Sequence, residues 1–200
     1  MLPPSIKSRP VYGTLSPKPG SLHLFVADAE GASAILNLAK TAPPDFFARA
    51  HIVYVSPGAA PQNYAKQLRQ LEPQAFYEGP SIAVALPRLA QVLATARMGT
   101  RVYLAGTEGL IGQAMRVAID AGVDHATIET EHRGSLARRV QCVHCKGVTE
   151  NVTTQPMICT YCGITLLVRD HYSRRISAFQ GVCVDAEEPG VIPVTEEIFR

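Results

Sequence analysis

Two Cys-x-x-Cys pairs constrain the C-terminal part of this chain more than any other sequence feature. Thirteen residues separate the pairs, which are Cys142 with Cys145 and Cys159 with Cys162. Four thiolates presented by two short loops form the tetrahedral ligand set of a metal site. Turn residues follow both pairs, Lys146-Gly147 and Gly163, and such residues let backbone N–H groups point at sulfur. The sequence therefore predicts one metal ion bound by four cysteines.

The spacing suits zinc or iron, because both accept a tetrahedron of sulfurs. We expect zinc, with iron as the alternative. Redox-active dithiols or disulfides would need an oxidising compartment, which nothing in the sequence indicates. Because four cysteines occupy all four coordination positions of the metal, we expect His144 and His171 not to be ligands. A catalytic zinc usually keeps an open position for water, and no nucleophile elbow, HExxH motif or P-loop is present. We therefore predict no catalytic residue.

Length and composition allow one ordinary domain with a small appendage. The chain has 200 residues, of which 46% are hydrophobic, whereas domains commonly contain about 100–150 residues. It lacks the run of about 20 apolar residues that a membrane helix needs, and Met1 to Pro10 contain no apolar signal segment. We expect a cytoplasmic protein. The fifth cysteine, Cys183, lies in an apolar run, and we expect it to be a small buried side chain.

Residues 21–132 alternate between strand-like and helical patterns. The expected strands are 22–27, 51–55, 74–77, 101–106 and 125–130. The expected helices are 32–40, 63–71, 82–96 and 109–121. Strands and helices that alternate with short turns predict a parallel sheet with helices on both faces, a Rossmann-like α/β domain. Residues 1–20 contain five prolines and are expected to form an extended arm.

Residues 133–184 are predicted to form a small β module around the cysteines, resembling a zinc ribbon or rubredoxin. We expect residues 136–141 to lead into the first pair and residues 148–154 to return as a strand. Residues 164–168 and 176–184 should form a hairpin. About fifty residues cannot bury a large core, so bound metal should supply folding free energy on the order of 10 kcal/mol. An acidic tail, residues 185–200, completes the chain.

Charge is segregated within the C-terminal part. From Arg133 to Arg175, seven Lys/Arg oppose two acids, a net charge of +5, whereas five acids from Asp185 onward oppose Arg200, a net charge of −4. Either the tail folds back on the basic module or each region meets a partner of opposite charge. The basic residues expected to face such an acidic surface are Arg133, Arg138, Arg139, Arg174 and Arg175. The acidic tail counts against nucleic-acid binding, for which the aromatic and basic residues of the module are otherwise suited.

A resemblance covers roughly residues 21–132. The stretch VYLAGTEGLIGQAMRVAIDAGVDHATIETE, residues 102–131, resembles the last strand–helix–strand of the pyridine-nucleotide domain in ferredoxin reductase-type flavoproteins. The turn within residues 25–35 lies where that family has its Gly-x-Gly loop. Here Asp28 and Glu30 replace the loop glycines, and carboxylates repel phosphate although they suit a helix N-terminus as caps. Ala105 also replaces the cysteine that the family places near the nicotinamide. We therefore expect this fold without a bound nucleotide, and we predict no cofactor-binding residue.

Polar residues gather at the end of the last expected strand of this domain. They are His125, Glu129, Glu131 and His132. The carboxyl ends of strands are where α/β sheets bind ligands. Because no other residue gives this group a defined chemical role, we expect a surface or interface patch.

A second resemblance extends from about Ser8 onward. The motifs RVYLAGTEG, TEHRGSLARRVQCVHCKG, CGITLLVRDHYSRR and FQGVCVDAE closely resemble the small accessory subunit of bacterial heme-dependent dimethylamine monooxygenase. The resemblance implies a heteromeric enzyme that oxidatively demethylates dimethylamine to methylamine and formaldehyde. It places heme on one partner subunit, and FMN with a [2Fe-2S] cluster on another that takes electrons from NAD(P)H. This chain is then expected to be a non-catalytic docking subunit, with a rubredoxin-like electron relay as the alternative.

Overall fold

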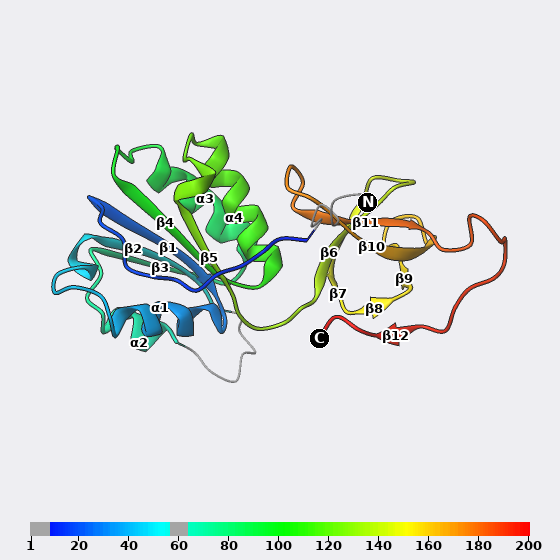
Figure 1. Ribbon diagram of the computed structural model, residues 1–200, viewed down its shortest axis with the longest axis horizontal. Helices are drawn as coiled ribbons and strands as arrows, with labels where there is room; N and C mark the ends of the chain where they lie inside the picture. Colours follow the sequence, from blue (N-terminus) through cyan, green and yellow to red (C-terminus); the bar gives the residue numbers. More distant parts are fainter. Residues whose placement is uncertain (1–8, 57–63) are drawn as a thin grey trace, which may run out of the picture. The chain divides into compact units, whose positions relative to one another are not determined.

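The computed structural model describes residues 9–56 and 64–200 of the chain (Figure 1). These residues form two compact units, one of residues 12–134 and one of residues 9–11 with 135–200. We call them the α/β unit and the β unit. In the part of the chain that is described, no helix has the length and apolar character needed to cross a membrane.

The α/β unit contains a five-stranded sheet in the order β3-β2-β1-β4-β5, and every neighbouring pair is parallel. Its strands are β1 (Leu22–Asp28), β2 (Ala50–Val55), β3 (Ala75–Gly79), β4 (Thr100–Gly106) and β5 (Ile128–His132). Central strands are apolar on both faces because both faces are covered by helices. The predicted parallel α/β fold is confirmed.

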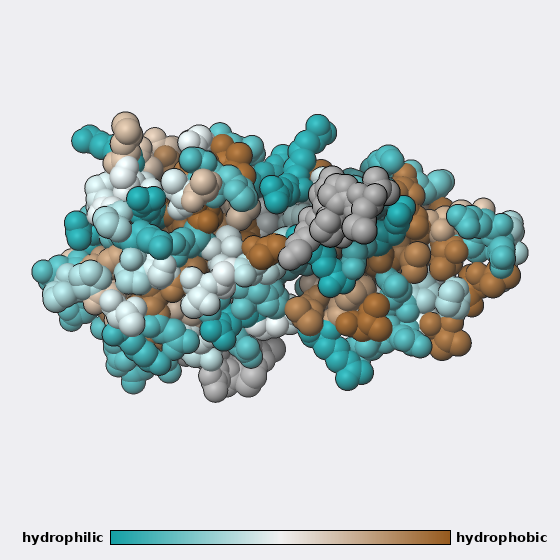
Figure 2. Space-filling model, in the orientation of Figure 1, coloured by the Kyte–Doolittle hydropathy of each residue, from teal (hydrophilic) through white to brown (hydrophobic). Residues whose placement is uncertain are grey.

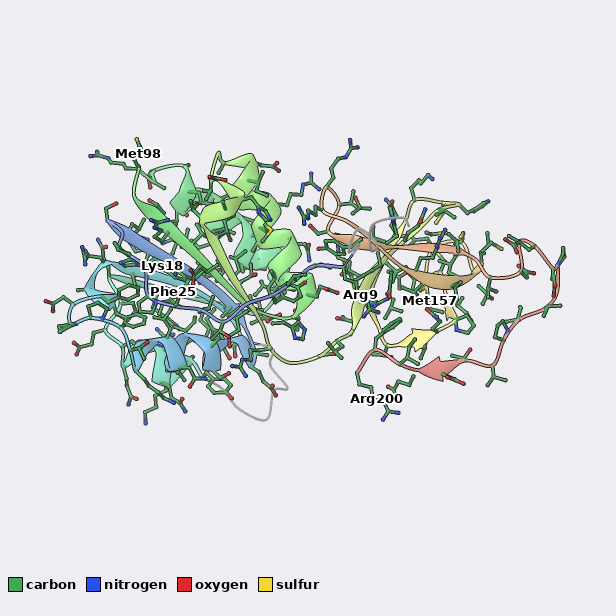
Figure 3. The ribbon with its side chains drawn as sticks, in the orientation of Figure 1. Arg9, Lys18, Phe25, Met98, Met157 and Arg200 are labelled. Carbon is green, nitrogen blue, oxygen red and sulfur yellow. The ribbon has the colours of Figure 1, made fainter. Side chains whose placement is uncertain are left out.

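Helices cover the two faces of this sheet in pairs (Figure 1). They are α1 (Gly31–Ala39), α2 (Ala65–Arg69), α3 (Ile82–Leu93) and α4 (Glu108–Asp120), with short 3-10 turns η1 (Phe47–Arg49) and η2 (His125–Thr127). Phe25 and Tyr103 pack with α1 and α2 on one face, whereas Val26 and Leu104 pack with α3 and α4 on the other. Figure 3 shows Phe25 within the first of these layers.

The last strand begins later than the sequence pattern suggested. Residues 125–127 form η2, because the Asp124 carboxylate accepts the N–H of Ala126 at 3.0 Å and caps this turn. Strand β5 therefore starts at Ile128. His125 lies in the turn and is separated from the other polar residues of the expected cluster.

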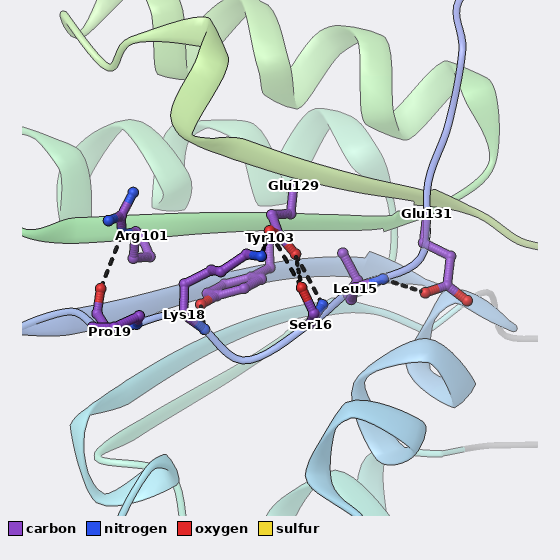
Figure 4. A network of polar contacts seen from close by, with 8 residues as sticks. All are labelled: Leu15, Ser16, Lys18, Pro19, Arg101, Tyr103, Glu129 and Glu131. Atoms are coloured by element: carbon purple, nitrogen blue, oxygen red, sulfur yellow. Dashed lines mark hydrogen bonds and ion pairs between the residues drawn. The ribbon is translucent and has the colours of Figure 1, made fainter. Parts of the chain in front are cut away.

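The arm has no helix or strand in residues 12–20, as predicted, but it is part of the α/β unit. Leu15 is only 5% exposed and joins the core beside α1. Its backbone N–H donates to a carboxylate oxygen of Glu131 at 2.7 Å, and that of Ser16 donates to Glu129 at 2.8 Å (Figure 4). The N–H of Lys18 donates to the Tyr103 hydroxyl at 3.1 Å.

These contacts correct the expectation of a surface patch at the end of β5. Glu131 is 4% exposed, and besides the arm it binds the Arg133 guanidinium at 2.5 Å. Glu129 binds the Lys18 ammonium at 3.3 Å. Both carboxylates thus satisfy backbone donors of a segment more than 100 residues away, which no local pattern could reveal.

The β unit contains a five-stranded sheet in the order β7-β6-β11-β10-β9 and a small sheet of β12 and β8. Its strands are β6 (Arg138–Cys142), β7 (Val148–Val152), β8 (Thr154–Gln155), β9 (Met157–Ile158), β10 (Thr165–Ser173), β11 (Ala178–Cys183) and β12 (Glu196–Glu197). The predicted hairpin of β10 and β11 is confirmed. Strand β11 also pairs in parallel with β6, and so lies between two cysteine-bearing hairpins.

The tail folds back on the β unit through strand pairing and a buried aromatic side chain. Strand β12 pairs antiparallel with β8, and Phe199 is 7% exposed in the core of the unit. The guanidinium of Arg138 lies 4.1 Å from the ring centre of Phe179 and 4.0 Å from that of Phe199. Arginine between two aromatic rings combines cation–π attraction with burial of its stem.

Three arginines that were expected to face an acidic partner surface or the acidic tail are bound to other acids within their own units instead. Arg138 is 6% exposed and pairs with Asp170 at 2.8 Å. Arg139 pairs with Glu150 at 2.7 Å, and Arg133 pairs with Glu131. Their acidic partners lie outside the tail. Of the five, Arg174 and Arg175 are exposed in the turn between β10 and β11.

Candidate metal centre

Each Cys-x-x-Cys pair occupies the turn of a hairpin. The first pair joins β6 to β7, and the second joins β9 to β10. In the first turn, Lys146 N–H donates to the Cys142 carbonyl at 3.0 Å, and in the second, Gly163 N–H donates to the Cys159 carbonyl at 3.0 Å. Both donors have left-handed backbones, with φ of 63° at Lys146 and 74° at Gly163. The two turns therefore have the same construction.

The four cysteine sulfurs converge on one point. All four Sγ atoms lie within 4.8 Å of one another. The shortest separations are 3.6 Å between Cys145 and Cys159 and 3.8 Å between Cys142 and Cys162, and all four residues are free cysteines. A disulfide would bring two sulfurs to about 2.05 Å. A tetrahedron with metal–sulfur bonds of about 2.3 Å instead places sulfurs about 3.8 Å apart, so the residues fit a metal ion.

Backbone N–H groups favour the thiolate forms, as the turn residues predicted. Gly147 N–H points at the Cys145 sulfur at 3.4 Å. Burial raises the pKa of the Cys159 thiol, but the N–H groups of Cys162 and Tyr161 and the neighbouring sulfurs outweigh it and lower the pKa to about 7. At Cys162 the Ile164 N–H favours the thiolate, yet burial and three neighbouring sulfurs raise the pKa to about 12.

Crowding of four sulfurs therefore opposes full deprotonation, and a bound cation would remove that opposition. Cys142 and Cys159 are buried, whereas Cys145 is exposed. A metal held by Cys142, Cys145, Cys159 and Cys162 would join the two hairpins covalently at their turns. Each cysteine would supply one thiolate, and the four thiolates together would complete tetrahedral coordination.

Two contacts around this centre were not expected from the sequence. A Cβ atom at Gly147 would lie 2.5 Å from the Tyr161 ring, so only glycine lets this ring cover the first turn. The hydroxyls of Thr149 and Thr160 are 3.1 Å apart and link the two hairpins. In the sequence, the contact of this ring with the first turn was indicated only by the position of Tyr161 inside the second Cys-x-x-Cys pair.

The other candidate ligands lie outside the cluster. Among the described residues, the group of side chains that could hold a metal consists of the four cysteines, without His144 or His171. The Cys183 sulfur lies 3.0 Å from a carboxylate oxygen of Asp185, which raises the pKa of the thiol. Cys183 is half-buried, so the expectation of a buried apolar side chain was wrong at this position.

The second place where a ligand could bind is the carboxyl end of β1 and β4. Strand order reverses between these neighbouring strands, and open α/β sheets bind ligands at such a point. Here Asp28 ends β1 and is 6% exposed. One of its oxygens accepts the Thr107 N–H at 2.8 Å, and the other accepts the Thr107 hydroxyl at 2.5 Å. Thr107 is the N-cap of α4. The carboxylate of Asp28 therefore lies at the N-terminus of α4, where the helix dipole favours negative charge.

The backbone around this crevice is fitted to the Asp28 side chain. Gly106 has a left-handed φ of 131°, and a Cβ there would lie 1.7 Å from an Asp28 oxygen. Glu30 stands at the N-cap of α1, but its side chain caps no N–H of that helix in the described chain. The expectation that both carboxylates cap α1 was thus wrong, because Asp28 turns toward α4. Burial raises the pKa of Asp28, and the two bonds from Thr107 partly offset that effect.

Comparison with known proteins identifies the family. Residues 4–128 match the N-terminal domain, and residues 139–182 the C-terminal domain, of the family described as dimethylamine monooxygenase subunit DmmA-like. The heme-dependent oxidative N-demethylase delta subunit of Ectopseudomonas mendocina (strain ymp) is 36% identical over 118 residues. This match covers 57% of the chain and 66% of the relative, slightly under two thirds of its length.

Solved structures resemble the chain more distantly. One is the flavohem-like FAD/NAD binding domain of nitric oxide dioxygenase from Vibrio cholerae O1 biovar El Tor, with 16% identity and a TM-score of 0.42, covering 62% of this chain and 55% of that chain. Another is the siderophore-interacting protein SipS from Aeromonas hydrophila, with 19% identity and a TM-score of 0.42, covering 57% and 51%. With family domains matched on both parts, the chain belongs to the DmmA-like family of dimethylamine monooxygenase subunits.

Proposed function

We propose that the chain is a non-catalytic docking subunit of a heteromeric monooxygenase that oxidatively demethylates dimethylamine to methylamine and formaldehyde. Family membership supports a place in such a complex. The single observation that carries the non-catalytic role is the bond between Asp28 and Thr107 at the carboxyl end of β1 and β4. It places a buried carboxylate of the chain itself at the point where strand order reverses, which is where open α/β sheets bind ligands.

Zinc is the metal that we propose for the four-cysteine site. Four thiolates from Cys142, Cys145, Cys159 and Cys162 satisfy a tetrahedral ion and leave no position for substrate or water. The ion would stabilise the β unit by holding its two hairpins together. In this role it supplies folding free energy, and the reaction itself proceeds elsewhere in the complex.

The partners that we propose are a heme-containing catalytic subunit and a reductase subunit with FMN and a [2Fe-2S] cluster. We place the complex in the cytoplasm. Nucleic acid is not among the proposed partners, because Arg133, Arg138 and Arg139 are already paired with the chain's own acids. Two compact units, each with its own core, suit a subunit that contacts more than one partner.

A second function is favoured by one observation, the exposure of Cys145. In a rubredoxin-like relay, iron in the same site would pass electrons between the flavin and heme subunits. A sulfur ligand at the surface shortens the path for an electron that enters or leaves. The relay needs iron, since zinc does not change its oxidation state.

Metal analysis and an absorption spectrum of the purified chain test both functions. We expect about one zinc per chain and no visible absorption. Iron together with visible thiolate-to-iron bands would overturn the purely structural role. Co-purification of the tagged chain from its native host tests the docking role. Heme and flavin subunits are expected in the eluate, and their absence at low salt would overturn it.

A further inference from the structure

The tail presents an apolar segment to solvent between two fixed ends. Residues 186–198 are all exposed, and within them Val191, Ile192 and Val194 are 59%, 53% and 84% exposed. Three large aliphatic side chains in four consecutive residues form a contiguous apolar group, which soluble surfaces usually avoid unless it binds something. Figure 2 shows hydrophobic residues gathered on the surface of the β unit. We call residues 186–195 the tail loop.

Both ends of the tail loop are attached to the β unit. Just before its start, Val184 N–H donates to the Thr165 carbonyl of β10 at 3.1 Å, and the Cys183 thiol of β11 donates to Asp185 at 3.0 Å. At its end, β12 pairs with β8, and the Phe199 side chain is buried. Arg200 contributes its carbonyl, which accepts the Leu136 N–H at 2.7 Å. A loop closed at both ends loses less conformational freedom on binding than a free tail would.

Charge specifies the kind of surface that fits the loop. Residues 185–198 contain five acids and no basic residue, and the acids lie on both sides of the aliphatic group. Pro193 removes one backbone N–H from the centre of the loop, so side chains must provide much of the contact. An apolar pocket bordered by Lys and Arg satisfies both features, because its core takes the aliphatic side chains and its rim takes the carboxylates.

We propose that the tail loop is an anchor that inserts Val191, Ile192 and Val194 into an apolar, basic-rimmed pocket of a partner subunit. This inference rests on the docking function proposed above and assigns it to a particular segment. The loop lies outside the two stretches that match family domains, residues 4–128 and 139–182.

A triple variant, Val191→Ser, Ile192→Ser and Val194→Ser, tests the anchor in the full chain expressed with its native partners. We expect co-purified partner subunits to fall at least about tenfold, because central apolar anchors dominate interface energy. The matched control is Met98→Ser in the α/β unit, which removes a side chain that is 98% exposed (Figure 3). It should retain the partners. Thermal unfolding and metal content of the triple variant should equal those of the wild type.

Each outcome separates the anchor from the docking function itself. If the wild-type chain brings no partner, the docking function fails. If the wild type and the triple variant bring equal amounts, the anchor alone is wrong. If the isolated wild-type chain forms dimers by light scattering and the triple variant is monomeric, the loop binds a second copy, which also overturns the anchor.

The double variant Glu187→Gln with Glu188→Gln tests the charge of the loop. It should reduce the capture of partner subunits at low salt and leave that capture unchanged at high salt.

Discussion

The four-cysteine centre and the crevice at the end of β1 and β4 differ in how their polar groups are satisfied. At the centre, four sulfurs lie within 4.8 Å of one another. A metal cation would bind all four sulfurs more strongly than any group of the chain does. In the crevice, the chain supplies both partners, the Asp28 carboxylate and the N-cap residue Thr107. A site prepared for a ligand leaves like charges facing one another. In the crevice, a hydrogen-bond acceptor and its donors are already paired within the chain.

The largest effect is expected from breaking the metal site. Cys159→Ser removes a buried thiolate, so the chain should lose its metal, and the β unit should lose cooperative unfolding because bound metal contributes on the order of 10 kcal/mol. The α/β unit should remain folded. Metal content by mass spectrometry and hydrogen exchange of each unit measure this. Cys183→Ser is the control and should keep one metal per chain. Retention of the metal by Cys159→Ser would contradict the four-cysteine assignment.

A smaller effect is expected from opening the crevice. Asp28→Ala leaves the N–H and hydroxyl of Thr107 without their buried acceptor, so the free energy of unfolding should fall by about 1–3 kcal/mol. Glu30→Ala is the matched control in the same turn. Since the Glu30 side chain caps no N–H of α1 in the described chain, its cost should stay below about 0.5 kcal/mol. Equal losses in urea unfolding would show that the two carboxylates act alike.

The pH dependence of stability should identify Asp28 as a buried acid. Burial raises its pKa above the ordinary value of 3.8, so the folded chain keeps this proton where the unfolded chain has released it. The carboxyl therefore stabilises the fold most below its unfolded pKa, and that contribution is lost as the pH rises through the folded pKa. Relative to Asp28→Asn, the wild type should lose stability from about pH 4 upward. Urea unfolding across that range checks this, and a difference independent of pH would refute it.

The smallest effect expected is none at all. The Asp28 carboxylate stands at the N-terminus of α4. We therefore expect the fluorescence of NADH and NADPH, at up to about 1 mM nucleotide, to be the same with and without the wild-type chain. A ferredoxin reductase-type flavoprotein in the same assay provides the positive control. A dissociation constant in the micromolar range would mean that the crevice can open, and would end its contrast with the metal site.

Local patterns predicted the parts of the fold that depend on local order. Alternating apolar runs indicated the parallel sheet. The Cys-x-x-Cys spacing and its turn residues indicated the four-cysteine cluster, including an N–H group that points at the Cys145 sulfur. The incompatibility of Asp28 with phosphate stays a prediction, and its partner Thr107 is 79 residues away. The direction of the Asp28 side chain, toward α4, could therefore not be derived from the residues that follow β1 alone.

Charged residues were harder to place, because their environment depends on distant segments. Arginine is usually a surface residue, yet the rings of Phe179 in β11 and Phe199 in the tail enclose the Arg138 guanidinium. Glu131 was expected at the surface and instead holds the arm. In both cases the side chain is buried because it is paired, which is the usual condition for burying charge. Pairing across the sheet carries no periodic signal in the sequence.

Strand β11 has a consequence for the order in which the β unit assembles. During synthesis both hairpin turns, ending at Cys162, leave the ribosome before β11 (Ala178–Cys183) exists. Since β11 is the strand that later hydrogen-bonds to both β6 and β10, the nascent hairpins lack that connection. A metal ion captured at this stage would be the first strong tie between them. It would hold open, at the correct spacing, the slot that the arriving strand completes.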